Sequence, residues 1–268
     1  MAQKKVTAVS LLEMKQRGEK ITMLTAYDYC TALLMDQAEI DVLLVGDSLG
    51  MVVMGEENTL PVTMDQMIHH TLAVARGAKR ALIVGDMPFM SYQLSPEQAA
   101  ENAGRFVKEG RAQTIKLEGG ADFVPHVKAI IRCGIPVMGH LGLTPQSIHQ
   151  FGGMKVQAKT DAAAKQLLEE AKTLEDAGVF SIVLEAVPAA VGEKVTKELT
   201  VPTIGIGAGP GCDGQVLVFN DMVGLFERFV PKFVKRYAEL APVMRDAFTR
   251  FRDEVRSGEF PGPEHVYK

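Results

Sequence analysis

Tryptophan is absent from this chain of 268 residues, and cysteine occurs only three times, as Cys30, Cys133 and Cys212. The cysteines lie far apart with no Cys-x-x-Cys spacing, which argues against a disulfide framework or a zinc site and fits a reducing compartment. No apolar run reaches membrane-spanning length. Residues 1–20 mix charged with apolar positions, so we expect no signal peptide and a cytoplasmic protein.

The chain also has no large excess of charge of either sign. It carries 29 Lys and Arg against 33 Asp and Glu, a net charge of −4. Such a balance provides no broad basic face for nucleic acid or an anionic membrane, so we expect a small-molecule partner. No Pro-, Gly- or Ser-rich linker divides the chain, and 47% of it is hydrophobic, which favours one domain over residues 1–268.

Five short apolar runs each stop at a polar residue. Buried parallel strands read as continuous aliphatic runs, and their carboxyl ends share one edge of the sheet, where ligands bind in α/β proteins. The pattern therefore predicts that the five polar residues converge on one site. The runs and the residues that end them are 42–46 before Asp47, 82–85 before Asp86, 115–117 before Glu118, 137–139 before His140 and 182–184 before Glu185.

Eight predicted strands alternate with helical patterns, which favours a (β/α)8 barrel. We expect strands near 21–25, 42–46, 81–85, 113–117, 135–139, 180–184, 202–206 and 216–219. We expect helices near 28–39, 63–78, 95–110, 121–133, 161–177 and 188–199, and a long one near 231–256. Because the last two strands are too close for a full crossover helix, an open doubly wound sheet stays possible.

The three acids Asp47, Asp86 and Glu118 indicate a magnesium site. Carboxylates crowded at one rim repel one another unless a cation binds between them. Mg²⁺ favours a few carboxylates and waters, whereas zinc would need more His or Cys ligands than a lone His140 supplies. A divalent ion together with Lys116 would balance the three negative charges. The simpler alternative is that each aspartate alone forms a turn or caps a helix.

A 2-oxo acid suits this set of residues. It chelates Mg²⁺ through its carboxylate and keto oxygens, which makes proton loss next to the carbonyl accessible. Glu185 is the carboxylate left to act as the base, and Lys116 would stabilise negative charge from inside the barrel. Lys116 could instead reach solvent, Glu185 could bond a helix terminus, and His140 taken alone is more typical of a hydrogen-bonded structural histidine.

The motifs resemble those of the ketopantoate hydroxymethyltransferase family, and they follow one another over nearly the whole chain. They are Thr25-Ala26-Tyr27-Asp28, the stretch 45–51 (VGDSLGM), Asp86-Met87-Pro88-Phe89, the stretch 116–120 (KLEGG), the stretch 139–146 (GHLGLTPQ), Phe151-Gly152-Gly153, Lys155-Val156-Gln157 and the stretch 205–209 (GIGAG). Two positions depart from the family pattern, with Ala158 in place of a glycine and Asn220 in place of a histidine.

The resemblance implies a (β/α)8 barrel of the phosphoenolpyruvate/pyruvate type. It also implies Mg²⁺-dependent transfer of a hydroxymethyl group from 5,10-methylenetetrahydrofolate to 3-methyl-2-oxobutanoate, in pantothenate synthesis. Cytoplasmic homo-oligomers, commonly decamers, are typical of the family, and the long C-terminal helix would serve such contacts.

The same resemblance assigns roles to individual residues. The metal carboxylates fall on Asp47 and Asp86, with Glu118 binding directly or through water. The 2-oxo acid contacts fall on Asp47, Ser48, Asp86 and Lys116, and the proton acceptor on Glu185. His140 would touch the substrate or the product hydroxyl, and no motif marks the folate site.

Two other functions compete with this one. A lyase of the same barrel group would use the same metal and enolate, but it would need a cysteine acid beside the site, and none of the three cysteines follows a strand end named above. A non-catalytic metabolite-binding barrel would tolerate the loss of Glu185 and Lys116, yet both are present.

Overall fold

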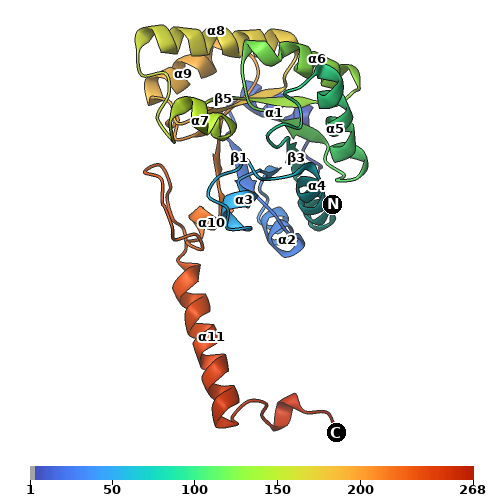
Figure 1. Ribbon diagram of the computed structural model, residues 1–268, viewed down its shortest axis with the longest axis vertical. Coiled ribbons are helices and arrows are strands. Elements are labelled where there is room, and N and C mark those ends of the chain that lie inside the picture. The colour runs from blue at the N-terminus through green and yellow to red at the C-terminus, as the bar shows by residue number, and fades with distance from the viewer. Residues whose placement is uncertain (1–3) are drawn as a thin grey trace. The chain divides into compact units, whose positions relative to one another are not determined.

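Eight parallel strands close into a barrel in chain order, from β1 to β8 (Figure 1). The computed structural model describes residues 4–268, and the barrel unit extends to Val218. Residues 219–268 form a second unit. The strands are β1 (Ile21–Thr25), β2 (Val42–Val45), β3 (Leu82–Asp86), β4 (Thr114–Lys116), β5 (Val137–Gly142), β6 (Ser181–Glu185), β7 (Thr203–Ile206) and β8 (Gly214–Leu217).

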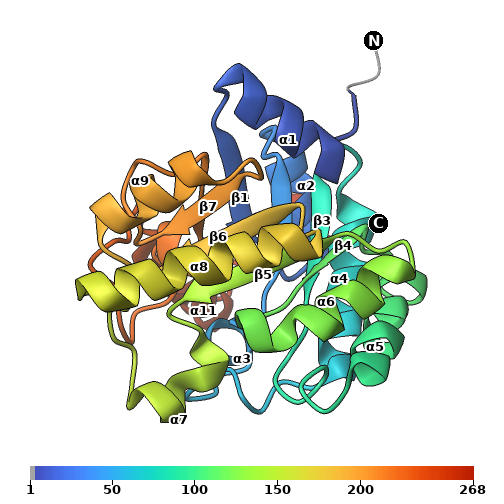
Figure 2. The same ribbon diagram turned by 90° about the horizontal axis from the view of Figure 1, so that it is seen from above.

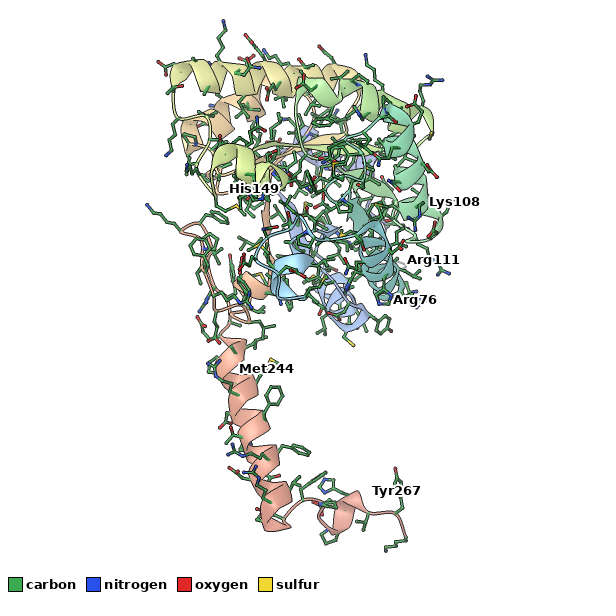
Figure 3. The ribbon with its side chains drawn as sticks, viewed as in Figure 1. Arg76, Lys108, Arg111, His149, Met244 and Tyr267 are labelled. Atoms are coloured by element: carbon green, nitrogen blue, oxygen red, sulfur yellow. The ribbon has the colours of Figure 1, made fainter. Side chains whose placement is uncertain are left out.

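Helices α4, α5, α6, α8 and α9 lie outside the strands, as the view in Figure 2 shows. The helices of the barrel unit are α1 (Ala8–Arg17), α2 (Tyr29–Gln37), α3 (Leu49–Val52), α4 (Met64–Gly77), α5 (Pro96–Lys108), α6 (Val124–Arg132), α7 (Ile148–Phe151), α8 (Asp161–Ala177) and α9 (Ala189–Glu198). Short 3-10 turns η1 (Ala121–Phe123) and η2 (Pro145–Ser147) precede α6 and α7. Basic side chains such as Arg76 and Lys108 lie on the outer surface of these helices (Figure 3).

Side-chain caps define where several of these helices begin. Thr63 and Gln66 form a reciprocal capping box at α4. The Ser95 hydroxyl accepts from the backbone of Gln98 at the start of α5, where a proline occupies the first turn. These hydroxyl groups satisfy backbone N–H groups that have no partner inside the helix, so the sequence itself sets the helix starts.

The barrel is closed by pairing between its first and last strands. Met23 of β1 aligns with Val216 of β8, so the open doubly wound sheet is wrong and the barrel is confirmed. The short link between β7 and β8 contains no helix. Gly209 there has a φ of +81°, and a Cβ at that position would lie 2.4 Å from the Ala189 side chain. The glycine-rich stretch therefore allows close backbone packing.

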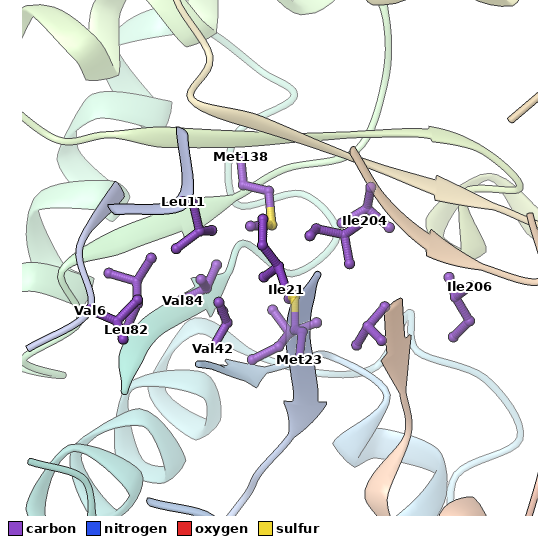
Figure 4. Packing of buried hydrophobic residues seen from close by; sticks show 13 residues of the cluster. Val6, Leu11, Ile21, Met23, Val42, Leu82, Val84, Met138, Ile204 and Ile206 are labelled. Atoms are coloured by element: carbon purple, nitrogen blue, oxygen red, sulfur yellow. The ribbon is translucent and has the colours of Figure 1, made fainter. Parts of the chain in front are cut away.

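Alternate strand positions point into the barrel, and those near the amino ends of the strands fill it with apolar side chains (Figure 4). Ile21 and Met23 of β1 belong to one buried cluster with Val84 of β3, Met138 of β5 and Val183 of β6. Because side chains alternate along a strand, the residue two positions after an inward-facing one also faces inward. The same faces that carry Val84, Met138 and Val183 therefore carry Asp86, His140 and Glu185 next.

Helix α1 supplies apolar side chains to the same cluster, which the sequence did not predict. Leu11 of α1 is fully buried and lies in the cluster together with Val6. The Lys15 ammonium forms a 2.9 Å ion pair with Asp213 and donates to the carbonyl oxygen of Thr196. The sequence of α1 shows no clear apolar periodicity, because only a few of its side chains reach the interior and charged residues lie between them.

The second unit contains α10 (Phe219–Met222), α11 (Leu240–Ser257) and the turn η3 (Pro263–His265). The long helix expected near 231–256 thus begins later, because Pro242 is tolerated only in the first turn of a helix. Along α11, exposed apolar side chains recur at helical spacing, at Met244, Phe248, Phe251 and Val255. Among residues 4–268, no helix combines the length and the apolar character needed to cross a bilayer.

We predict that Leu11→Ala destabilises the protein by roughly 2–5 kcal/mol, because it leaves a cavity where α1 meets the barrel interior. Denaturant unfolding measures this difference. The exposed Val9 of the same helix, changed to alanine, is the matched control and should change stability by less than about 0.5 kcal/mol. Equal effects at the two positions would contradict the role of α1 as part of the core.

Candidate active site

The polar residues predicted from the strand ends do converge on one edge of the barrel. Asp86, Lys116 and Glu185 are the last residues of β3, β4 and β6. Asp47 and Glu118 follow β2 and β4 by two residues, and His140 lies within β5. Asp47, Asp86, Lys116, Glu118 and His140 are all less than 5% exposed. The predicted burial of Lys116 and Glu118 on the inner face of the strand is confirmed.

A continuous series of charged contacts joins these residues. The Lys116 ammonium lies 2.7 Å from Asp86 Oδ1 and 3.8 Å from Glu118 Oε1. His140 continues the series, with Nδ1 3.4 Å from Glu118 Oε1 and Nε2 3.3 Å from Glu185 Oε2. At the other end, the Asp47 backbone N–H donates to Asp86 Oδ2 at 3.2 Å. The simpler alternative for Lys116, that its side chain reaches solvent, is therefore wrong, because the side chain is buried and contacts the acidic cluster.

The burial and crowding of these charges raise the pKa values of the two aspartates. Burial, and then repulsion by Asp86 and Glu118, raises the pKa of Asp47 well above its ordinary value. Burial also raises the pKa of Asp86, although Lys116 opposes the shift. The pKa of Glu118 is lowered, because hydrogen bonding to His140 and the nearby cations outweigh its burial. Negative charge is thus least well compensated at Asp47 and Asp86.

His140 is held as a cation by the acids on either side of it. Burial and the Lys116 charge lower its pKa, but hydrogen bonds to Glu118 and Glu185 and the Glu118 charge outweigh them and raise it to about 9. The pKa of Lys116 is also raised, because the charges of Asp86, Glu118 and Asp47 outweigh its burial. Two cations therefore face four carboxylates in this cluster, which leaves an excess of negative charge.

Gln146 and Tyr92 join the same network, and the sequence analysis missed both. The Gln146 amide donates to Asp47 Oδ2 and its backbone N–H donates to Glu118 Oε2, at 2.9 and 3.0 Å. The Tyr92 hydroxyl lies 2.9 Å from the Glu118 carbonyl oxygen and 3.1 Å from Gln146 Oε1, and it can donate its one hydrogen to either acceptor. Gln146 ends the 139–146 motif, which was the one available signal. Ser48 lies beside Asp47, with its hydroxyl 2.9 Å from that of Tyr27.

The donor set fits a divalent cation bound by few protein ligands. Among residues 4–268, no three acidic, histidine or cysteine side chains are arranged to ligate one metal together. Mg²⁺ does not require three, because it keeps several waters and takes one or two carboxylates. The buried oxygens of Asp47 and Asp86 and the excess of negative charge match that requirement.

Comparison with known proteins identifies the family. The model of a family described as ketopantoate hydroxymethyltransferase matches residues 5–263. The chain belongs to the ketopantoate hydroxymethyltransferase family. A 3-methyl-2-oxobutanoate hydroxymethyltransferase of Syntrophobacter fumaroxidans is 60% identical over 263 residues, covering 98% of this chain and 93% of that protein. One of Syntrophus aciditrophicus is 58% identical, covering 98% and 97%. The expected family and transferase class are thus confirmed.

Solved structures show the same fold at low sequence identity. A phosphonopyruvate hydrolase in complex with oxalate and Mg²⁺ has a TM-score of 0.65 and 13% identity, covering 97% of this chain and 93% of that one. A 2,3-dimethylmalate lyase of the PEP mutase/isocitrate lyase superfamily has a TM-score of 0.62 and 17% identity, covering 96% and 92%. The ketopantoate hydroxymethyltransferase family member described here therefore has the predicted (β/α)8 barrel fold.

We predict that His140 of the metal-free protein titrates near pH 9, which NMR of its imidazole measures directly. Because the folded pKa exceeds the ordinary value of about 6.5, the stability that this group contributes is complete below pH 6.5 and is lost as the pH rises through 9. The stability advantage over His140→Gln should shrink across that range. A midpoint at or below 6.5 would contradict the bridging role of His140 between two carboxylates.

Proposed function

We propose that this member of the family transfers a hydroxymethyl group from 5,10-methylenetetrahydrofolate to 3-methyl-2-oxobutanoate in a Mg²⁺-dependent reaction. The product is ketopantoate, an intermediate of pantothenate synthesis. The observation that carries the proposal is the continuous series of contacts from Asp86 through Lys116, Glu118 and His140 to Glu185. It provides a cation-binding end and a basic end within one buried site of a chain that matches the family over nearly its full length.

Asp47 and Asp86 would hold the metal ion, since their oxygens are buried and their negative charge is the least compensated. Both oxygens of Glu118 are already engaged, Oε1 near His140 and Oε2 with the Gln146 backbone, which favours a contact through water. When bound, Mg²⁺ would stabilise negative charge on the keto oxygen of the substrate.

Glu185 would accept the proton from C3 of the 2-oxo acid. Its carboxylate is the most exposed acid of the series, with 17% of the side chain accessible, so substrate can reach it. Water would add to the methylene carbon of the folate as both C–N bonds of that carbon break and the two nitrogens take the hydrogens of the water, which releases tetrahydrofolate and leaves formaldehyde. The C3–H bond of the 2-oxo acid would break toward the carboxylate, the electron pair of that bond would add to the formaldehyde carbon, and the formaldehyde oxygen would take the proton to become the product hydroxyl.

The cations of the site would act on the charge that develops in this step. The buried Lys116 ammonium lies between Asp86 and Glu118, where it would stabilise the substrate carboxylate or the enolate. The His140 imidazole, with Nε2 3.3 Å from Glu185 Oε2, would hold that carboxylate in place, and we assign it a contact with the product hydroxyl. Ser48, beside Asp47, would donate to the bound acid.

We further propose a cytoplasmic homo-oligomer, a decamer by the family resemblance. The exposed apolar positions of α11 recur on one helical face, and Phe248 and Phe251 are both more than half exposed. Such a face is typical of helices that pack against another subunit. The free thiols of Cys30, Cys133 and Cys212 agree with a reducing compartment.

We predict that the purified protein with Mg²⁺ and 5,10-methylenetetrahydrofolate converts 3-methyl-2-oxobutanoate to ketopantoate. Glu185→Gln should retain binding of the 2-oxo acid but slow exchange of its C3 hydrogen with deuterated water by roughly 10²–10⁴-fold, because the general base is lost. NMR follows the exchange. Glu193→Gln, on the exposed face of α9, is the control and should exchange at the wild-type rate.

Two results would count against this proposal. Undiminished exchange in Glu185→Gln would assign the base elsewhere. An absence of turnover by the wild-type protein, with cleavage of hydroxylated dicarboxylates instead, would support a lyase.

A further inference from the structure

The side chain of Gln146 has no part in the proposed reaction, yet both of its polar atoms make hydrogen bonds to neighbouring groups. Its Nε2 donates to Asp47 Oδ2 and to the Met87 carbonyl oxygen, both at 2.9 Å. Its Oε1 accepts from the Tyr92 hydroxyl at 3.1 Å and from Gln93 Nε2 at 3.0 Å. An amide has two donor hydrogens and two acceptor lone pairs, so both hydrogens are used, one lone pair accepts from Gln93, and the other shares the Tyr92 hydrogen with the Glu118 carbonyl oxygen.

These bonds allow only one orientation of the amide. If it were flipped, the Gln146 oxygen would face the Asp47 carboxylate and the Met87 carbonyl oxygen, and its NH₂ group would face the Gln93 NH₂ group. Buried like-with-like contacts of this kind leave polar groups unsatisfied, which is costly. The Asp47 carboxylate and the Met87 carbonyl oxygen can only accept, so they require the Gln146 NH₂ group to face them, and the contacts of Tyr92 and Gln93 with Oε1 support this orientation.

Gln146 also connects the loops that carry the carboxylates. It lies in the turn η2 after β5, yet it bonds Asp47 after β2, Met87 after β3 and, through its backbone, Glu118 after β4. The turn is rigid at this point, since Pro145 begins it and the residue is only 6% exposed. The separation between Asp47 and Glu118, which repel each other, is thus determined in part by one residue, which bonds the first through its side chain and the second through its backbone.

We propose that Gln146 is the positioning residue of the site, holding the Asp47 carboxylate through Oδ2 so that its other oxygen, Oδ1, is presented to a divalent cation. The inference rests on the function proposed above, in which Asp47 and Asp86 hold the metal. Asp47 needs such support more than Asp86, because Asp86 already has the Lys116 ammonium 2.7 Å away. Tyr92 acts through Gln146, by fixing the orientation of its amide.

The test is binding of Mn²⁺ alone to the full-length protein, followed by electron paramagnetic resonance. Gln146→Met keeps the length of the side chain but removes the donor, and it should weaken Mn²⁺ binding roughly ten- to hundredfold, as expected for loss of a hydrogen bond to a charged group. The line shape of the bound ion should also change, which a general loosening of the loop would not produce. Turnover should fall with little change in the KM for the 2-oxo acid.

The matched control is Gln98→Met, in the first turn of α5. Gln98 donates its amide to the Met90 carbonyl oxygen and accepts from the Leu94 backbone, so its loss loosens the β3–α5 loop without touching a carboxylate. It should bind Mn²⁺ within twofold of the wild type. An equal loss in the two variants would contradict the proposed role.

Tyr92→Phe provides a second variant that preserves the ring and its packing. It should weaken Mn²⁺ binding about three- to tenfold, and the double variant with Gln146→Met should bind like Gln146→Met alone, since coupled residues are non-additive. Additive losses would contradict action through Gln146, and wild-type affinity in Tyr92→Phe would do so even if Gln146→Met failed to fold.

Metal binding by the wild-type protein distinguishes a failure of the role of Gln146 from a failure of the proposed metal site. Normal Mn²⁺ binding by the wild type with an unchanged Gln146→Met variant overturns only the role of Gln146. Failure of the wild type to bind either Mn²⁺ or Mg²⁺ overturns the proposed metal site, and the inference with it.

Discussion

The repulsion among buried carboxylates is the constraint on which the rest of this site depends. Asp86 and Glu118 lie 2.7 and 3.8 Å from the Lys116 ammonium, Asp47 bonds Asp86 through its backbone, and all four residues are almost fully buried. Like charges at such distances in a protein interior interact strongly, and burial weakens their solvation as well. The repulsion is relieved by further positive charge, from His140 or a bound cation, or by protonation of a carboxylate, toward which the raised pKa of Asp47 points.

The barrel allows these charges to be crowded together because stabilising residues and site residues occupy different positions along each strand. The inward positions near the amino ends of the strands carry aliphatic side chains, joined by Leu11 of α1, and these provide the hydrophobic stabilisation. The next inward positions carry Asp86, His140 and Glu185. The residues that stabilise the barrel and the residues of the site therefore lie on the same inward face of each strand. Burial of the apolar side chains offsets the free-energy cost of burying the charged ones.

Much of this arrangement could be predicted from the sequence because it depends on local rules. Strand ends share one edge and alternate residues share one face, which is sufficient to bring Asp47, Asp86, Lys116 and Glu185 together. The role of Gln146 could not be predicted, since its partners come from three other loops whose conformations depend on tertiary packing. Helix α1 was missed for a similar reason, because its one fully buried side chain, Leu11, is meaningful only against the barrel.

The central claim is that the excess negative charge at Asp47 and Asp86 is there to bind a divalent cation. Thermal unfolding with increasing Mg²⁺ tests it most directly, since a ligand at 100 times its Kd stabilises a protein by about 2.7 kcal/mol. The melting temperature of the wild type, and of the surface control Asp65→Asn, should rise with Mg²⁺, whereas that of Asp86→Asn should rise little. A rise as large in Asp86→Asn, or none in the wild type, would contradict the account.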